Sequence, residues 1–82
     1  NWDRLEDVAV YRGHMRDALT ATSNGGATTH AYGIKVPAAA FGTDGSARPK
    51  SAAGTPGSLM HEAMSRGVRV GLVNSGSAIE PG

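Results

Sequence analysis

Two short stretches rich in β-branched and other apolar residues lie toward the two ends of the chain. Residues 8–16 read Val-Ala-Val-Tyr-Arg-Gly-His-Met-Arg, and residues 68–74 read Val-Arg-Val-Gly-Leu-Val-Asn. Side chains of this kind favour extended backbone. We therefore expect a strand in each stretch, the first bent or bulged at Gly13 and the second mostly buried.

Two stretches between these strands carry the start and stop signals of helices. Residues 22–32 begin with the turn cluster Thr-Ser-Asn-Gly-Gly and are followed by Gly33, which can end a helix in the left-handed conformation. Residues 58–67 begin with a serine that can cap a helix and end with a glycine that can stop one. We expect a short helix that opens near Ser23 and a second, clearer helix over 58–67.

The order of these elements predicts an α/β fold. The helix over 58–67 leads directly into the strand at 68–74, an order typical of layered folds with a parallel sheet. Residues 37–58 are mostly Ala, Gly, Ser, Thr and Pro, which predicts a long surface loop. Residues 75–77 then fall at the carboxyl end of the strand, where open α/β sheets bind their ligands.

The composition predicts a thin core and a partner that completes it. The chain has 82 residues, 12 of them glycine, and no cysteine. Chains this small usually need disulfides, a metal or a partner to fold stably. The formal charge of +1 comes from eight Lys/Arg against seven Asp/Glu without a basic face, and no apolar run reaches the roughly 20 residues of a membrane helix. We expect neither nucleic acid nor membrane among the partners.

Several catalytic motifs are incomplete. His61-Glu62 begins a zinc-protease helix motif, but the residue one turn later is Ser65 and not a second histidine. The glycine-rich stretches lack the lysine of a phosphate-binding loop. Neither metalloprotease nor nucleotide-binding chemistry is therefore expected.

Ser23 is the strongest candidate for chemistry. A serine at the start of a helix places its hydroxyl beside the free N–H groups of the first turn, where the helix dipole favours an anion. Gly25 and Gly26 would let a phosphate approach that backbone closely, and a metal or a base could activate the serine as a nucleophile. Taken alone, these residues favour the simpler interpretation that Ser23 or Asn24 is a helix cap.

The order of motifs along the chain resembles the alkaline phosphatase family. Residues 27–35, Ala-Thr-Thr-His-Ala-Tyr-Gly-Ile-Lys, and residues 40–44, Ala-Phe-Gly-Thr-Asp, are similar to the family stretch S-A-x-x-A-T-A-x-x-x-G-x-K with its later A-L-G-x-D. Residues 58–63 and 67–71 look like the family's helix–strand unit, T-I-L-E-x-A and G-L-x-T-G. Counting back along the first stretch without a gap puts Ser23 on the family's phosphorylated serine.

The resemblance implies a metal-dependent phosphomonoesterase. Such an enzyme hydrolyses phosphate monoesters through a phosphoserine intermediate, here on Ser23, with zinc and magnesium as cofactors. Helix N–H groups around Asn24 and Gly25 would hold the phosphoryl oxygens. Glu80 falls where the family places a residue close to magnesium, so it is a candidate metal ligand or partner of a metal-bound water.

The chain also departs from the family pattern. Thr22 stands where the family usually has an aspartate that orients the phosphate-binding arginine. Thr28 is the backup hydroxyl, the alternative candidate for the nucleophile if Ser23 does not serve. The family's other metal ligands and its arginine lie upstream or downstream of these residues. The isolated chain is therefore expected to be inactive and to bind neither metal alone.

The resemblance further implies a place for the chain in a larger protein. Residues 1–82 would form a single incomplete segment of the catalytic domain, within a three-layer sandwich built on a mainly parallel sheet. The parent enzyme would be periplasmic or secreted and homodimeric, and the remainder of the enzyme would be the partner of this segment. Two alternatives stay open: a small autonomous α/β binding or interaction module with Ser23 as a helix cap, and an independent small phosphatase.

Overall fold

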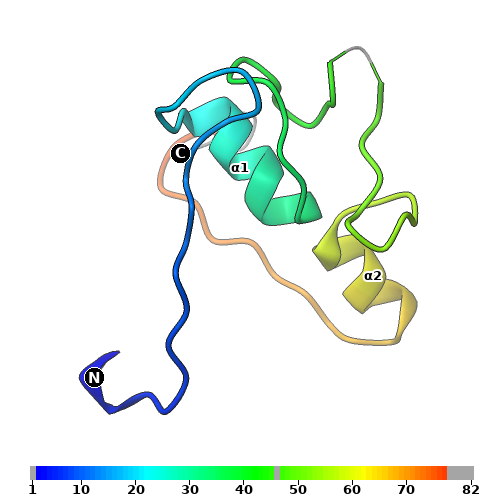
Figure 1. The fold of residues 1–82 in the computed structure, drawn as a ribbon. Coiled ribbons are helices and arrows are strands. Elements are labelled where there is room, and N and C mark those ends of the chain that lie inside the picture. Colours follow the sequence, from blue (N-terminus) through cyan, green and yellow to red (C-terminus); the bar gives the residue numbers. More distant parts are fainter. Residues whose placement is uncertain (1, 46, 78–82) are drawn as a thin grey trace.

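Two α-helices joined by turns form the centre of the computed structural model, which describes residues 2–45 and 47–77 (Figure 1). A short 3-10 helix, η1, spans Trp2–Arg4, and the α-helices are α1 (Ser23–Tyr32) and α2 (Leu59–Ser65). Within these ranges the β pairing is limited to two isolated antiparallel bridges, Asp44 with Ala47 and Lys50 with Pro56. No helix in the described part of the chain has the length and apolar character needed to cross a membrane.

Local sequence signals set both ends of α1. Thr22 is extended, with φ −125° and ψ 159°, and its hydroxyl accepts a hydrogen bond from the Gly25 N–H at 3.2 Å. At the other end Gly33 adopts the left-handed conformation, with φ 71°, and its N–H donates to the Thr29 carbonyl. The helix predicted to open near Ser23 and close at Gly33 is confirmed.

Helix α2 is also bounded by its own sequence. The Ser58 hydroxyl accepts from the His61 N–H at 3.2 Å, which caps the first turn. Glu62 and Arg66 form an ion pair at 2.7 Å along the exposed side, and Gly67 follows with a φ of 79°. The helix predicted over 58–67 is confirmed.

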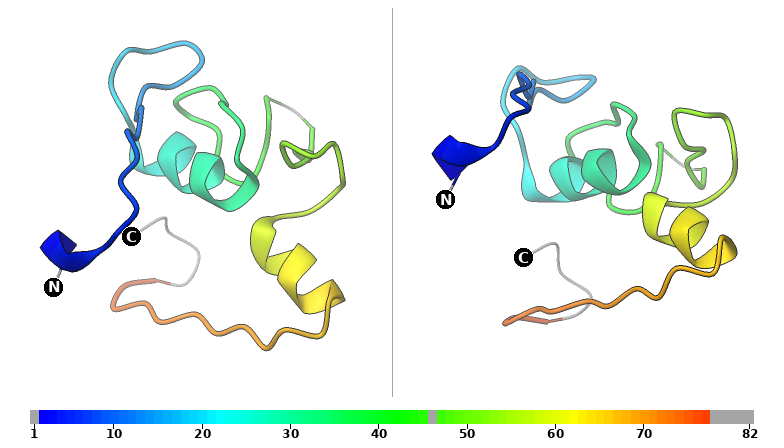
Figure 2. Two further views of the ribbon diagram at one scale, coloured as in Figure 1. Left: turned by 60° about the horizontal axis from the view of Figure 1, so that its bottom comes forward. Right: turned by 90° about the horizontal axis from the view of Figure 1, so that it is seen from below.

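The core is a small cluster on one side of α1. Its buried apolar side chains are Met15, Val36 and Ala40, and Thr28 and Thr29 of the helix are buried with them. Figure 2 shows the chain segments before and after α1 passing close to that helix. Because so few apolar side chains are buried, hydrophobic burial contributes little here, and polar contacts carry more of the packing.

Residues 36–42 join α1 to the loop that precedes it. The Ala38 N–H donates to the Asp17 carboxylate at 2.7 Å. The Ala38 carbonyl accepts from the Thr22 hydroxyl at 2.5 Å and from the Gly25 N–H at 3.2 Å. The start of the stretch 37–58, for which the sequence predicts a surface loop, is therefore held against the helix.

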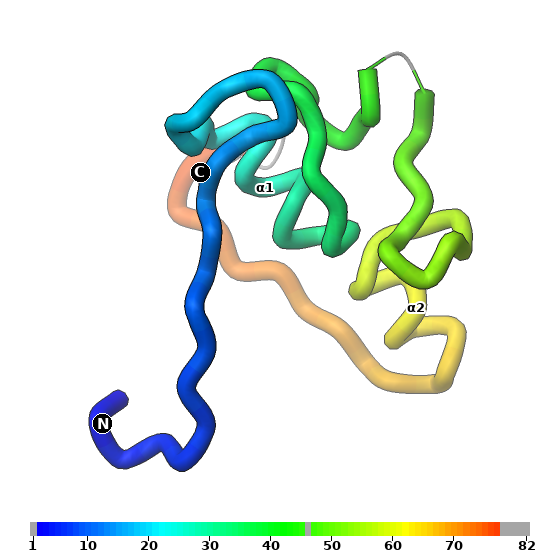
Figure 3. The backbone as a smooth tube through the Cα atoms, viewed as in Figure 1, coloured from blue at the N-terminus to red at the C-terminus, as the bar shows by residue number. Residues whose placement is uncertain are grey.

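The predicted α/β fold is wrong, and with it the three-layer sandwich and its mainly parallel sheet. The described residues contain no sheet. Residues 8–10 and 68–74 run as separate extended chains outside the helical centre (Figure 3), whereas Met15 of the first stretch is buried in the core. Val73, expected to be mostly buried, is fully exposed. β-branched residues favour an extended backbone locally, but a sheet also needs a neighbouring strand, and neither stretch has one in the part of the chain that the structure describes.

Adding one methyl group at two adjacent glycines tests this packing. A Cβ at Gly25 would lie 2.4 Å from the Met15 sulfur and 2.9 Å from the Pro37 carbonyl oxygen, whereas a Cβ at Gly26 would meet no atom of the described residues within 4 Å. We expect Gly25→Ala to lower the free energy of unfolding by about 1–3 kcal/mol. Gly26→Ala should raise it by up to about 1 kcal/mol, because alanine favours the helix. Urea denaturation followed by circular dichroism measures both, and equal effects would contradict the close approach at Gly25.

Candidate functional site

Ser23 is the first residue of α1, and its side chain is exposed to solvent. The residue that caps the helix is its neighbour Thr22, so the interpretation of Ser23 or Asn24 as the cap is wrong. The Thr22 hydroxyl accepts from the Gly25 N–H and donates to the Ala38 carbonyl. Because Thr22 does the capping, the Ser23 hydroxyl is left free to face solvent at the start of the helix.

The first turn of α1 offers two backbone donors beside Ser23. The N–H groups of Ser23 and Asn24 have no backbone acceptor among the described residues, as expected for the first turn of a helix. The helix dipole adds positive potential at the same end. Together these groups form a local environment that favours an anion near the Ser23 hydroxyl.

Gly25 lies in this turn but is used for packing. Its N–H already donates to the Thr22 hydroxyl and to the Ala38 carbonyl, and its Cα faces Met15 and Pro37. The expectation that Gly25 lets a phosphate approach the backbone is therefore not met in this conformation, because packing covers that residue. A phosphoryl oxygen would reach the Gly25 N–H only in place of those two acceptors.

Thr28, the predicted backup hydroxyl, is in the core and not beside Ser23 on the surface. It is 2% exposed. Its Oγ1 lies 3.1 Å from the Asn24 carbonyl oxygen and 3.0 Å from the Ala40 carbonyl oxygen, and it accepts from the Gly42 N–H at 2.8 Å. These contacts occupy the hydroxyl and give Thr28 a structural role.

The described residues do not fit a zinc or magnesium site. Within them, no three His, Cys, Asp or Glu side chains gather closely enough to hold a metal ion. Glu80, the candidate metal ligand, lies outside the described residues. Any metal that activates Ser23 would need ligands from elsewhere.

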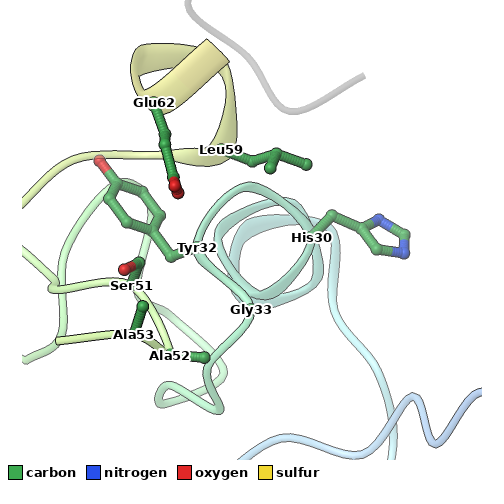
Figure 4. Close-up of a pocket in the computed structure, with 8 residues that line it drawn as sticks. All are labelled: His30, Tyr32, Gly33, Ser51, Ala52, Ala53, Leu59 and Glu62. Atoms are coloured by element: carbon green, nitrogen blue, oxygen red, sulfur yellow. The ribbon is translucent and has the colours of Figure 1, made fainter. Parts of the chain in front are cut away.

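A recess that the sequence did not indicate lies between the two helices (Figure 4). It measures about 270 Å³, and its walls include Tyr32, Ala52, Leu59 and Glu62. The Glu62 carboxylate projects into this region in Figure 4 and also pairs with Arg66. Since α1 rises about 1.5 Å per residue, its Tyr32 end lies roughly 14 Å from Ser23. The recess is therefore not an extension of the Ser23 environment.

Comparison of the chain with protein families, with curated proteins and with solved structures found no match.

Removing the Thr28 hydroxyl while keeping the side-chain shape tests its role. Thr28→Val leaves the Ala40 carbonyl and the Gly42 N–H without their buried partner, so we expect a loss of about 1–3 kcal/mol in the free energy of unfolding. Thr28→Ser keeps the hydroxyl and should cost less than about 1 kcal/mol. Chemical denaturation of both variants measures the difference. A valine variant as stable as the serine variant would show that these hydrogen bonds do not support the fold.

Proposed function

We propose that this chain carries the nucleophile of a phosphomonoesterase, Ser23, and that residues outside these 82 complete the active site. The observation that carries the proposal is the exposed Ser23 hydroxyl at the first position of α1. Beside it are two N–H groups that have no backbone acceptor among the described residues. The resemblance of the motif order to that of the alkaline phosphatase family also supports Ser23 as the nucleophile. The substrate class is phosphate monoesters.

The reaction assigned to Ser23 is transfer of a phosphoryl group. The Ser23 Oγ forms a bond to phosphorus as the bond from phosphorus to the ester oxygen breaks. The serine proton is lost to a base, and the departing alkoxide takes up a proton to leave as an alcohol. Water then attacks the phosphoserine, which returns the serine and releases inorganic phosphate.

The N–H groups of Ser23 and Asn24 have a specific part in this scheme. Charge on the equatorial phosphoryl oxygens must be stabilised while the bonds change, and preformed N–H donors at a helix start do this without reorganisation. The Thr22 cap holds the turn in that geometry through its bond to Ala38. Asn24 and Ser23 are therefore the proposed phosphate-binding residues in this segment.

The remainder of the enzyme is the proposed source of zinc, magnesium and their ligands. The described residues assemble no metal site, so the isolated chain is expected to hydrolyse no phosphate monoester. Exposed apolar side chains support a partner surface: Val8, Leu19 and Val73 are each more than nine-tenths exposed, and covering them would be favourable. By resemblance, the parent enzyme is a periplasmic or secreted homodimer.

Acid quenching of the parent enzyme during turnover of p-nitrophenyl phosphate tests the nucleophile. With zinc and magnesium present, we expect the trapped phosphoryl group on Ser23 in peptide mass spectra. Ser23→Ala should lower kcat by at least about a thousandfold, because the covalent step is lost. Ser65→Ala, an exposed serine at the end of α2, is the matched control and should leave kcat unchanged.

Two outcomes would contradict the proposal. A trapped phosphoryl group on another residue, with full activity in Ser23→Ala, would remove Ser23 from the mechanism. Turnover by the 82-residue chain alone, abolished in Ser23→Ala, would instead identify an independent small phosphatase.

A further inference from the structure

A second hollow lies near the end of α1 that is far from Ser23. It measures about 430 Å³, and its walls come from the end of α1, from the loop between the helices and from the start of α2. The residues that line it are Tyr32, Gly42, Arg48, Pro56, Gly57, Ser58 and His61. None of them carries a carboxylate, which distinguishes this hollow from the recess that contains Glu62.

The polar side chains of the hollow can all donate hydrogen bonds, and that of Arg48 can only donate. Arg48 contributes a guanidinium group, His61 an imidazole, and Tyr32 and Ser58 contribute hydroxyl groups. The Ser58 oxygen accepts from the His61 backbone N–H at 3.2 Å, and its hydroxyl hydrogen remains available to donate. Four donors around one hollow favour a ligand that is rich in acceptor oxygens.

Arg48 forms no ion pair with any described residue. The nearest acidic side chains in sequence are engaged elsewhere: Asp44 pairs with Arg16 at 2.6 Å, and Glu62 pairs with Arg66 at 2.7 Å. The positive charge on the wall of the hollow is therefore not neutralised within the described part of the chain.

The imidazole of His61 packs against the backbone of this wall. Gly57 has a φ of 107°, and a Cβ at that position would lie 2.6 Å from the His61 Cδ2 atom. The imidazole therefore lies directly against the Gly57 backbone, in a place that only glycine leaves open. One side of the imidazole is thus covered by the backbone, while the residue as a whole is exposed to solvent.

We propose that this hollow binds a phosphate-type oxyanion through Arg48, with His61, Ser58 and Tyr32 as additional donors. The guanidinium group matches two oxygens of a tetrahedral anion at once, which makes arginine well suited to phosphate. The anion can be inorganic phosphate or the phosphate group of a monoester, since both present the same oxygens. This site is independent of Ser23, which lies at the opposite end of α1.

Titration of the full chain with inorganic phosphate tests the site. At constant ionic strength maintained with chloride, we expect saturable shifts of the Gly57, Ser58 and His61 amide signals in nuclear magnetic resonance spectra. Arg48→Gln should weaken phosphate binding at least about tenfold, because a charged hydrogen-bond donor is lost. Arg69→Gln, an equal loss of charge on the exposed stretch after α2, is the control and should leave the affinity unchanged.

Further variants and a second titration distinguish binding at this hollow from binding at the proposed nucleophile. Ser23→Ala should leave the titration unchanged, and a parallel titration with phenyl phosphate shows whether the free ion or the ester binds more tightly. His61→Gln should weaken binding without changing the helix signals. Shifts that never saturate, or equal weakening by Arg48→Gln and Arg69→Gln, would show only diffuse attraction to positive charge and would overturn the proposal.

Discussion

The buried hydroxyl of Thr28 connects α1 to the segment that follows it. It bonds to the Asn24 or Ala40 carbonyl and accepts from the Gly42 N–H, so one buried atom joins the helix to the segment that follows it. With only Met15 and two smaller apolar side chains buried around α1, the chain relies on such contacts more than a larger domain does. Each is worth about 1 kcal/mol net, but leaving its partners unpaired costs more.

The segment that follows α1 also contacts both polar sites. Residues 36–42 are bonded to the start of α1 through Ala38 and reach the far hollow at Gly42. The exposed Ser23 hydroxyl and the Arg48 hollow thus lie at opposite ends of α1. Their separation is set by helix length and exceeds the screening length at physiological salt, so the two proposed anion sites would not repel each other directly.

The two α-helices were predictable because their boundaries depend on neighbouring residues. Ser58 and Gly33 act within one turn of backbone, and the sequence shows them directly. That the two extended stretches stay unpaired among the described residues was not predictable. Pairing depends on a partner strand, which the local pattern of Val68–Val73 does not specify. The cap was misassigned by one residue, since Thr22, Ser23 and Asn24 can all serve as caps and tertiary contact with Ala38 selects Thr22.

The hollow lined by Arg48 and His61 could not be predicted from the sequence either. The two residues are 13 positions apart, and the turns between them bring them to one wall. Similarly, Gly25 looked like an opening for phosphate, although its contact with Met15 is what requires glycine there. The glycine at position 25 indicated that another group approaches the backbone closely there. The sequence alone did not show whether that group is a packed side chain or a ligand.

The unpaired extended stretch after α2 affects how the chain behaves in solution. The backbone N–H and C=O groups of 69–73 bond to no other described residue and so depend on water for their hydrogen bonds. Two open edges with apolar side chains are a template for pairing between molecules. Arg69 places a positive charge within that stretch, where it opposes the stacking of identical chains and limits self-association as concentration rises.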